Sequence, residues 1–418
     1  MRMEQETPLV VAGGGAAGMM AAIAAAELGC RVILVEPNEK VGRKLYITGK
    51  GRCNVTNACD QDTLMAHMVR NRRFLYSALS RFSPWDTMDF FEGLGIPLKI
   101  ERGNRVFPVS DRSADIIDGL FFRLRDLGVS VVQDRVCQLV VEQGILTGVC
   151  LAKQGKTPCK GVILATGGAS YPRTGSTGDG YRLAEQVGHR IVPVRGSLVP
   201  LASNDPCCKR LQGLSLRNVR ASVTDREGRC IYDQQGELLF THFGLSGPLM
   251  LSASAHMDGA DYVVHIDLKP ALDRQKLDQR LLRDFADRSN QDFVNALGSL
   301  LPKAMIPVVV ERSGIAGDTK VHNLRRAQRQ RLLELLKDFT IPIQGLRPVA
   351  EAVITAGGVD VGQVNPGSMA SKLVRGLYFA GEVLDVDAYT GGFNLQIAWA
   401  TGRAAGQGAA NWARKEAT

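Results

Sequence analysis

The N-terminal part of the chain alternates short apolar runs with helical stretches. Residues 9–11 are all apolar, which predicts a short buried strand. An alanine-rich stretch follows to Leu28 and stops at Gly29, which predicts a helix. Residues 31–35 and 161–164 predict two further strands of the same sheet. The alternation continues to about residue 193 and predicts a Rossmann-like, doubly wound α/β domain.

The hydrophobic period then changes twice. Between residues 194 and 268, short apolar runs are separated by turn signals such as Glu227-Gly228, which predicts a β-rich insert. Residues 269–347 predict a helical insert, with apolar side chains at helical spacing: Leu277, Leu281, Phe285, Leu332, Leu335, Leu336 and Phe339. The chain from residue 348 to 418 returns to the first pattern and ends in a helix over residues 392–412. We therefore predict one α/β domain, formed by 1–193 and 348–418, with two inserts.

Composition narrows the class of protein. The 418 residues provide for two or three domains. Nine cysteines include no CxxC pair, and the adjacent Cys207 and Cys208 do not suit a disulfide framework, so the pattern predicts a reduced, cytoplasmic protein. Six histidines lack the HxxxH or HxH spacing of metal ligands, which predicts no bound metal. Early acids, and glycines that interrupt the first apolar run, argue against a signal peptide and a membrane span.

The net charge of +9 favours a polyanionic partner, although mild basicity alone does not identify one. The cations gather in three clusters: Arg70, Arg72, Arg73 and Arg81; Lys209, Arg210, Arg217 and Arg220; Lys320, Arg325, Arg326, Arg329 and Arg331. The third cluster contains no acid, so it either contacts phosphate groups or forms a solvated face over the neighbouring leucines. Its candidate RNA contacts are Arg325, Arg326 and Arg329.

The first strand leads into a glycine-bearing turn that opens the first helix: Gly13, Gly14, Gly15, Ala16, Ala17 and Gly18. This GxGxxG spacing lets the backbone approach a pyrophosphate at the helix N-terminus. Glu36 ends the second strand, 18 residues past Gly18, where a carboxylate accepts hydrogen bonds from the adenosine ribose. A glycine-rich turn without a ligand is the alternative, and the register of strand, helix, strand and acid counts against it.

A second glycine-bearing segment lies near the end of the chain, where residues 381–387 run into residues 391–396. Doubly wound FAD enzymes return at the chain end to hold the isoalloxazine, so the two motifs together predict FAD. The last helix would direct its positive end at the flavin. The candidate contacts are Gly381, Glu382, Asp387, Gly392, and the backbone of Asn394, Leu395 and Gln396. Glu382 alternatively caps a helix.

Three intervening stretches are also expected at the cofactor. Two cations follow Gly42, where the chain should pass the pyrophosphate, and a glycine-rich loop continues from them toward the flavin ring. A later strand is expected to touch the adenine through its backbone, and small residues after residue 164 let the backbone pass close by. These candidate contacts are Arg43, Lys44, Gly51, Arg52, Asn54, Val136, Ala165, Thr166 and Gly167. Arg52 and Asn54 either hold an anionic or carbonyl group or brace the loop.

The runs at residues 42–57, 165–180 and 241–248, together with the C-terminal segment, resemble the YhiN/BaiN-like bacterial flavoproteins over essentially the whole chain. The resemblance implies a split Rossmann-like FAD domain, a β-barrel-like insert and a helical insert, with Asp387 near the ribityl chain or pyrophosphate. The family is similar at longer range to fumarate reductase-type flavoproteins. It includes bile-acid enone reductases and an enzyme that reduces a uridine of large-subunit ribosomal RNA to dihydrouridine. This chain more closely resembles the latter branch.

Flavin chemistry of this kind requires an acid in the protein. Reduced flavin delivers a hydride to a C=C bond conjugated to a carbonyl, as in uracil or a steroid enone, and an acid protonates the neighbouring carbon. Cys53, in the loop expected near the flavin, is either this acid or a small buried side chain that fills the loop. His242 is the second candidate, and its alternative role is to hydrogen-bond its own glycine-rich loop.

Three functions are compatible with these observations. The first is reduction of the C5=C6 bond of a uridine in 23S ribosomal RNA, with FAD as cofactor and NAD(P)H as reductant. The second is a small-molecule ene-reductase or amine oxidase on the same scaffold. The third is a flavin-dependent protein that binds ribosome precursors. No second GxGxxG follows a predicted strand, so the sequence does not locate an NAD(P)H site.

Overall fold

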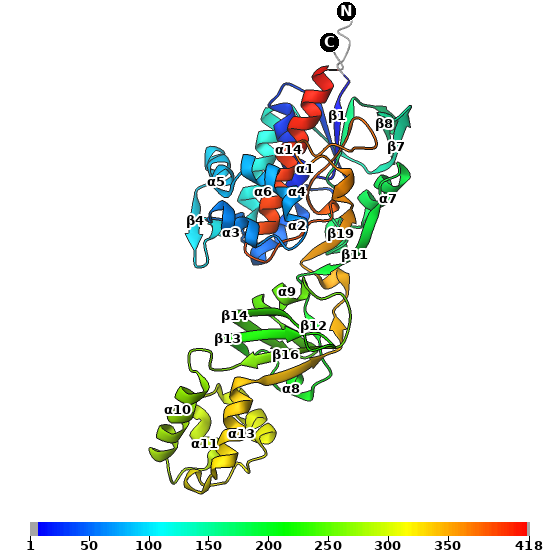
Figure 1. Cartoon of the computed structure of the whole chain (residues 1–418). Coiled ribbons are helices and arrows are strands. Elements are labelled where there is room, and N and C mark those ends of the chain that lie inside the picture. Colours follow the sequence, from blue (N-terminus) through cyan, green and yellow to red (C-terminus); the bar gives the residue numbers. More distant parts are fainter. Residues whose placement is uncertain (1–6, 416–418) are drawn as a thin grey trace, which may run out of the picture. The chain divides into compact units, whose positions relative to one another are not determined.

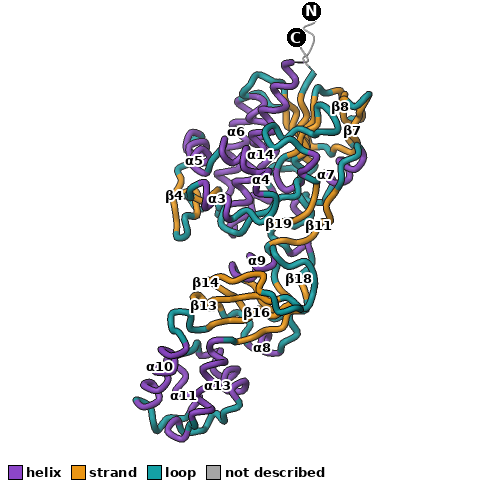
Figure 2. The backbone as a smooth tube through the Cα atoms, in the orientation of Figure 1, coloured by secondary structure: helices purple, strands orange, loops and turns teal. Residues whose placement is uncertain are grey.

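The computed structural model describes residues 7–415, which form two compact units (Figure 1, Figure 2). Unit 1 contains the described residues up to Ser197 and from Val349 on, and unit 2 is Leu198–Pro348. Unit 1 is therefore split in sequence around unit 2. Its first part extends beyond residue 193 because β11 (Ile191–Ser197) pairs antiparallel with β19 (Ile354–Val359) from the second part.

A five-stranded parallel sheet forms the centre of unit 1. Its order is β20-β10-β1-β2-β6, and all neighbouring pairs are parallel. The strands are β1 (Leu9–Ala12), β2 (Val32–Glu36), β6 (Ser130–Gln133), β10 (Gly161–Leu164) and β20 (Leu377–Phe379). Strands β1, β10 and β20 are buried along their whole length, as apolar strands of a sheet covered on both faces are. This is the doubly wound arrangement that the sequence predicted.

The first and last helices of unit 1 pack closely together. Figure 1 shows α1 (Ala16–Ala26) beside α14 (Phe393–Lys415). A Cβ atom at Gly402 would lie 2.4 Å from the carbonyl oxygen of Ala17, and one at Gly406 would lie 2.3 Å from that of Ala21. Glycine at these positions therefore permits the close approach of α14 to the alanine-rich α1. This contact brings the N-terminal glycine turn and the C-terminal segment into one region.

Smaller elements surround the central sheet. Two three-stranded sheets have the orders β3-β5-β4 and β7-β8-β9. Their strands are β3 (Thr56–Asn57), β4 (Leu98–Glu101), β5 (Arg105–Pro108), β7 (Val136–Glu142), β8 (Ile145–Leu151) and β9 (Gly155–Pro158). The other helices are α2 (Arg43–Ile47), α3 (Gln61–Ala66), α4 (Arg72–Arg81), α5 (Pro84–Gly93), α6 (Ser113–Asp126) and α7 (Asp179–Gln186).

Unit 2 contains a seven-stranded antiparallel sheet in the order β17-β16-β13-β14-β15-β12-β18. The strands are β12 (Leu201–Ala202), β13 (Ser215–Thr224), β14 (Cys230–Thr241), β15 (Gly244–Ser246), β16 (Tyr262–Asp267), β17 (Phe339–Ile343) and β18 (Gly345–Leu346). The two outer strands, β17 and β18, are separated only by Gln344, whose N–H donates to the Ala202 carbonyl at 3.0 Å. Strands β17 and β18 thus form one nearly continuous strand that pairs with β16 on one side and with β12 on the other. This pairing closes the sheet into a barrel-like form.

Helices complete unit 2. They are α8 (Pro206–Arg210), α9 (Pro248–Ser254), α10 (Arg274–Ala286), α11 (Phe293–Ala296), α12 (Ile306–Ser313) and α13 (Arg326–Lys337). The prediction that Phe339 belongs to the helical pattern is wrong. Helix α13 ends at Lys337, and Phe339 begins β17 opposite Ile266 of β16. The β-branched residues that follow favour this strand, so the helical insert ends before residue 347.

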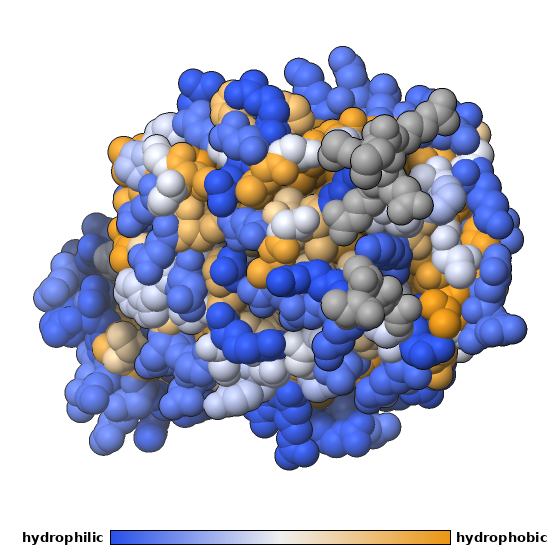
Figure 3. All heavy atoms as spheres, turned by 90° about the horizontal axis from the view of Figure 1, so that it is seen from above, coloured by the Kyte–Doolittle hydropathy of each residue, from blue (hydrophilic) through white to orange (hydrophobic). Residues whose placement is uncertain are grey.

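The surface is mixed in polarity. Figure 3 shows hydrophilic side chains over most of the visible face, with apolar residues in small groups between them. Within residues 7–415, no helix is both long and apolar enough to cross a membrane. No group of three or more His, Cys, Asp or Glu side chains in this described range could hold a metal ion.

Candidate functional site

The glycine turn between β1 and α1 combines tight packing with open space. Gly13 has φ +105°, and a Cβ atom there would lie 2.5 Å from the carbonyl oxygen of Ala165. A Cβ at Gly18 would lie 1.8 Å from the carbonyl oxygen of Gly13, whereas a Cβ at Gly15 would meet nothing within 4 Å. The open side of Gly15 faces the N-terminus of α1, where free backbone N–H groups favour a phosphate. The turn therefore has the form that a dinucleotide pyrophosphate requires.

Glu36 ends β2 with its carboxylate held in place. Its exposed fraction is 8%, and it accepts hydrogen bonds from the Gly14 N–H (2.7 Å) and the Asn38 N–H (2.9 Å). The side chain of Asn38 also donates to Glu36 (2.6 Å) and accepts from Arg43 (2.7 Å). Sequence reasoning missed Asn38, although its position two residues after the acid is typical of a local side-chain to backbone turn.

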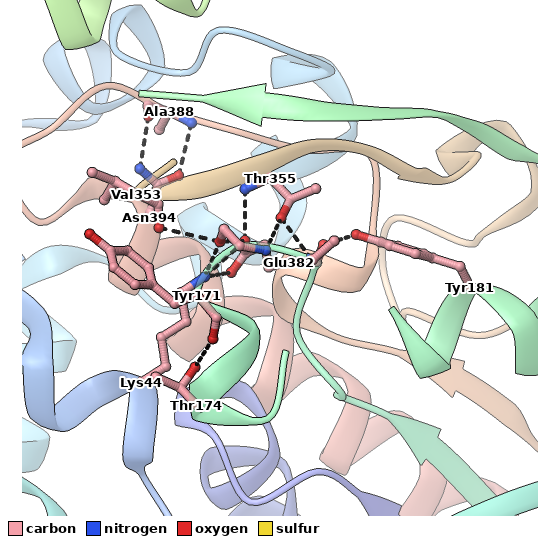
Figure 4. Close-up of polar contacts among 11 residues, drawn as sticks. Lys44, Tyr171, Thr174, Tyr181, Val353, Thr355, Glu382, Ala388 and Asn394 are labelled. Carbon is pink, nitrogen blue, oxygen red and sulfur yellow. Dashed lines mark hydrogen bonds and ion pairs between the residues drawn. The ribbon is translucent and has the colours of Figure 1, made fainter. Parts of the chain in front are cut away.

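Glu382 links three segments of unit 1 (Figure 4). It accepts hydrogen bonds from Lys44 Nζ (2.7 Å), Ser170 Oγ (3.0 Å) and the Thr355 N–H (2.7 Å). Thr355 Oγ1 in turn accepts from the Ala169 N–H at 2.8 Å. Lys44 is therefore engaged by Glu382, and Glu382 acts as a tie between α2, β19 and the loop after β10 rather than as a helix cap. Sequence reasoning did not find Ser170 or Thr355.

Asp387 is fully buried in the segment before α14. Ser197 Oγ donates to one carboxylate oxygen at 2.7 Å, and Arg70 Nε lies 3.3 Å from the other. Burial raises the pKa of Asp387 to about 6, against the opposing effects of Ser197 and Arg70. A group of this kind changes its charge within the range of ordinary assay conditions.

The loop at residues 48–54 is braced largely by its own side chains. Cys53 has φ +59° and no exposed surface, and burial raises its pKa to about 12. Arg52 pairs with Glu101 and Asp111, and its guanidinium lies 4.2 Å from the centre of the Phe107 ring. This burial and these ion pairs favour the alternatives in which Cys53 fills the loop and Arg52 braces it.

Two neutral buried polar atoms near this site, Asn54 Oδ1 and Thr166 Oγ1, have no hydrogen-bond partner among the described residues, and the charged Asp387 Oδ1 has only its ion pair with Arg70. Buried polar groups are normally satisfied, so such atoms call for a ligand. Asn54 and Thr166 lie in stretches predicted to contact the cofactor, as do Ala165, which bonds Ala12, and Gly167, with φ +74°. Val136 begins β7 and is 4% exposed. Together with the open side of Gly15 and the fixed Glu36, these atoms fit an FAD molecule.

The C-terminal turn holds its side chains internally. Gly392 has φ +100°, and a Cβ atom there would lie 2.4 Å from the Thr56 backbone. The Asn394 side chain accepts from the Ala388 N–H (2.9 Å) and donates to the Ala388 carbonyl (2.8 Å), as Figure 4 shows. Gln396 is buried and bonds Thr56 Oγ1 at 2.7 Å. The side chains of Asn394 and Gln396 are thus bonded within the protein.

Four predicted site residues lie in unit 2. His242 is exposed in the turn between β14 and β15, and its ring contacts Phe243 at 5.0 Å between centroids. The ring makes no hydrogen bond among the described residues, so the alternative that it bonds its own loop is not realised. Arg325 and Arg326 are exposed at the start of α13. Arg329 is instead half-buried and paired with Asp278 of α10 at 2.8 Å.

The nucleotide turn at α1, the acid that ends β2 and the glycine turn at α14 define an FAD-dependent oxidoreductase with a Rossmann-like fold. The family model of the HI0933-like protein Rossmann domain matches residues 7–408, and the chain belongs to this family. The family predicted from the sequence is thereby confirmed.

Two curated relatives are similar over nearly the whole chain. Ribosomal RNA dihydrouridine synthase of Escherichia coli (strain K12) is 34% identical over 408 residues, covering 95% of this chain and 96% of the relative. The 3-dehydro-bile acid delta(4,6)-reductase of Clostridium scindens is 32% identical over 414 residues, covering 96% and 98%. Among solved structures, 3-ketosteroid-delta4-(5alpha)-dehydrogenase from Rhodococcus jostii RHA1 has a TM-score of 0.53 at 16% identity, covering 97% of each chain. This last similarity supports the fold.

Proposed function

We propose that this protein reduces the C5=C6 bond of a uridine in 23S ribosomal RNA to dihydrouridine, with FAD as cofactor and NAD(P)H as reductant. The similarity to the E. coli ribosomal RNA dihydrouridine synthase over 95% of this chain carries the proposal. The net charge of +9 favours it over a steroid-like substrate, because RNA is a polyanion. Activity on ribosomal RNA would place the protein in the cytoplasm.

The proposal assigns holding and orienting roles to unit 1. When bound, FAD supplies the hydride transfer. The backbone amides around Gly15 hold the pyrophosphate, and Glu36 accepts the ribose hydroxyls. Asn54 Oδ1 and Thr166 Oγ1, both without partners, bond the remaining polar groups of the cofactor. The Glu382 tie to Lys44 and Thr355 keeps the loops around the cofactor in place.

The two predicted proton donors have different surroundings. Cys53 has no exposed surface, and its pKa of about 12 means that the thiol keeps its proton. A general acid must reach the substrate and release a proton near the working pH. His242 is exposed and makes no competing hydrogen bond among the described residues. We therefore propose that the proton does not come from Cys53, and His242 of unit 2 stays a sequence-based candidate.

Nucleoside mass spectrometry of 23S ribosomal RNA tests the proposal. RNA from cells that lack the gene should have less dihydrouridine than RNA from cells that carry it. The purified FAD-loaded protein should restore the modification to the deficient RNA when NAD(P)H is supplied. Equal dihydrouridine in both RNAs would refute the proposal.

Reduction of a small conjugated enone is the second candidate function, favoured by the 32% identity to the bile acid reductase. Its test uses the same preparation, with the flavin reduced in the absence of oxygen. Rapid reoxidation by an enone, together with unchanged ribosomal RNA, would support this function in place of the first.

A further inference from the structure

Helix α4 begins with two positive charges, which destabilise the N-terminus of a helix. Its first two residues are Arg72 and Arg73, and its first turn contains no acid. Cations at a helix N-terminus oppose the helix dipole and destabilise the helix. The preceding Asn71 has φ +49° and makes no side-chain cap. Unfavourable charges and a missing side-chain cap occur together here, and no internal contact of the two arginines compensates for them. Such a combination indicates a functional role for these residues.

These two arginines are also available to a partner. Arg72 and Arg73 are exposed, and neither makes a hydrogen bond or ion pair among the described residues. Arg70 differs from them because it lies beside the buried Asp387. Tyr76, one turn further along α4, is 57% exposed, and its ring stands on the same side of the helix as the two arginines. Two guanidinium groups thus lie next to a bare aromatic ring.

The start of α4 is held by hydrogen bonds to residues 385–389, which belong to the C-terminal segment predicted to contact the flavin. The Val69 N–H donates to the Asp387 carbonyl at 2.9 Å, and the Tyr389 N–H donates to the His67 carbonyl at 3.1 Å. The Asn71 side chain donates to the Asp385 carbonyl at 2.6 Å. The strip of chain that leads into α4 is therefore bonded along residues 385–389, just before the glycine turn of α14. Helix α4 also packs against α14 (Figure 1).

We infer that Arg72, Arg73 and Tyr76 form a docking surface for single-stranded RNA beside the flavin site. The guanidinium groups pair with phosphates, and the Tyr76 ring stacks on an unpaired base. Single-stranded RNA is the ligand that matches both the two cations and the exposed ring. The bases of a duplex are already stacked and paired, and a small uncharged enone carries no phosphate to pair with the two arginines. This inference rests on the proposed function and locates its substrate near the flavin, rather than only at the predicted arginines of α13.

The test compares variants of the full-length FAD-loaded protein. Arg72→Gln combined with Arg73→Gln should weaken binding of a 23S ribosomal RNA transcript roughly 10- to 30-fold at 0.1 M salt. The slope of log affinity against log salt should fall by about 1.4, since two phosphate contacts are lost. Arg72→Lys with Arg73→Lys should retain most binding. Tyr76→Ala should lose about tenfold, and Tyr76→Phe should retain the stacking.

A matched control removes the same charge elsewhere. Arg414 and Lys415 are the last two residues of the 23-residue helix α14. They lie about 33 Å along the helix axis from its first residue, Phe393, which follows the glycine turn. Arg414→Gln with Lys415→Gln should leave RNA binding close to that of the unchanged protein. The FAD content and the rate of flavin reduction by NAD(P)H should also be unchanged in the α4 variants. Their melting temperature should stay equal or rise, because the helix loses unfavourable charges.

The outcomes separate this inference from the function on which it rests. If the unchanged protein forms dihydrouridine but the α4 double variant binds RNA normally, the docking surface is refuted and the function stands. An equal loss in the α14 control would also refute the surface, because binding would then follow net charge alone. If the unchanged protein neither binds RNA nor forms dihydrouridine, the function and the inference fall together.

Discussion

Asp387 in unit 1 and Asp205 in unit 2 are both largely buried carboxylates, and the two units treat them differently. Burial raises the pKa of Asp387 to about 6, because the Ser197 hydroxyl and the Arg70 guanidinium only partly compensate for it. Burial also acts on Asp205, but hydrogen bonds from Cys207 and Arg312, the latter at 2.5 Å, outweigh it and lower its pKa. Unit 2 pairs its acid completely, whereas unit 1 leaves its acid partly unpaired.

Buried neutral groups show the same contrast. Unit 1 contains Asn54 Oδ1, Thr166 Oγ1 and His189 Nδ1 without hydrogen-bond partners among the described residues, and the first two lie at the predicted cofactor site. Within the described part of unit 2, no buried side-chain nitrogen or oxygen lacks a hydrogen bond. Unit 2 thus satisfies its buried polar side chains internally, whereas unit 1 leaves two buried polar atoms at the predicted cofactor site for a ligand to bond.

The largest expected difference separates Glu36 of unit 1 from Asp267 of unit 2, which bonds Lys337 Nζ at 2.5 Å. Glu36→Gln should weaken FAD binding by about 2–5 kcal/mol, because a buried charged acceptor is lost. Asp267→Asn should lower the melting temperature and leave the FAD affinity unchanged. Calorimetric titration of the apoproteins with FAD and thermal unfolding measure the two effects. Normal FAD affinity in Glu36→Gln would contradict the assignment of this site.

The second difference is in pH dependence. Asp387 has a folded pKa of about 6, above its unfolded value, so its neutral form is favoured by folding. Its contribution to stability is present at low pH and is lost as pH rises from about 4 to 6, amounting to about 3 kcal/mol. Asp387→Asn should therefore flatten this fall. Asp205→Asn should act in the opposite sense, because a lowered pKa gives stability that is lost as pH falls. Urea unfolding between pH 3 and 7 would decide, and parallel curves for Asp387→Asn and the unchanged protein would contradict the comparison.

The smallest difference concerns two hydroxyl groups. Thr166→Val should leave the apoprotein as stable as before, since Thr166 Oγ1 has no partner, and weaken FAD binding by about 1–2 kcal/mol. Ser254 of unit 2 accepts from the Val199 N–H at 2.9 Å, so Ser254→Ala should cost about 1–2 kcal/mol of stability with normal FAD affinity. Chemical unfolding and FAD titration measure both. A destabilised Thr166→Val apoprotein with normal FAD affinity would reverse the contrast.

The sequence predicted the parts of the fold that are encoded locally. The strand before Gly13, the helix after it and the acid at Glu36 follow from neighbouring residues and a fixed register. The tie between Lys44 and Glu382 spans 338 positions, and no local pattern contains it. The spacing of Phe339 continues that of α13, and its pairing with β16, together with the β-branched residues that follow it, places it in a strand.

The candidate surface cations show the same limit. Arg325, Arg326 and Arg329 are alike in sequence, and only the approach of Asp278 from α10 neutralises Arg329. Exposure distinguishes Arg72 and Arg73 from Arg70 in a similar way, because Asp387 lies beside Arg70. Clusters of like charge can therefore be recognised in a sequence, but the members that are free for a partner depend on tertiary contacts.

Strand β20 and helix α14 follow unit 2 in the sequence, which sets the order in which the two parts of unit 1 are synthesised. A ribosome completes the contiguous unit 2 before it synthesises the strand that borders β10 and the helix that packs on α1. Until then the nascent chain carries only the first glycine turn, and the second half of the site does not exist. The glycine turn before α14 is therefore made after unit 2, and only then are the two glycine-bearing halves of the predicted flavin site present together.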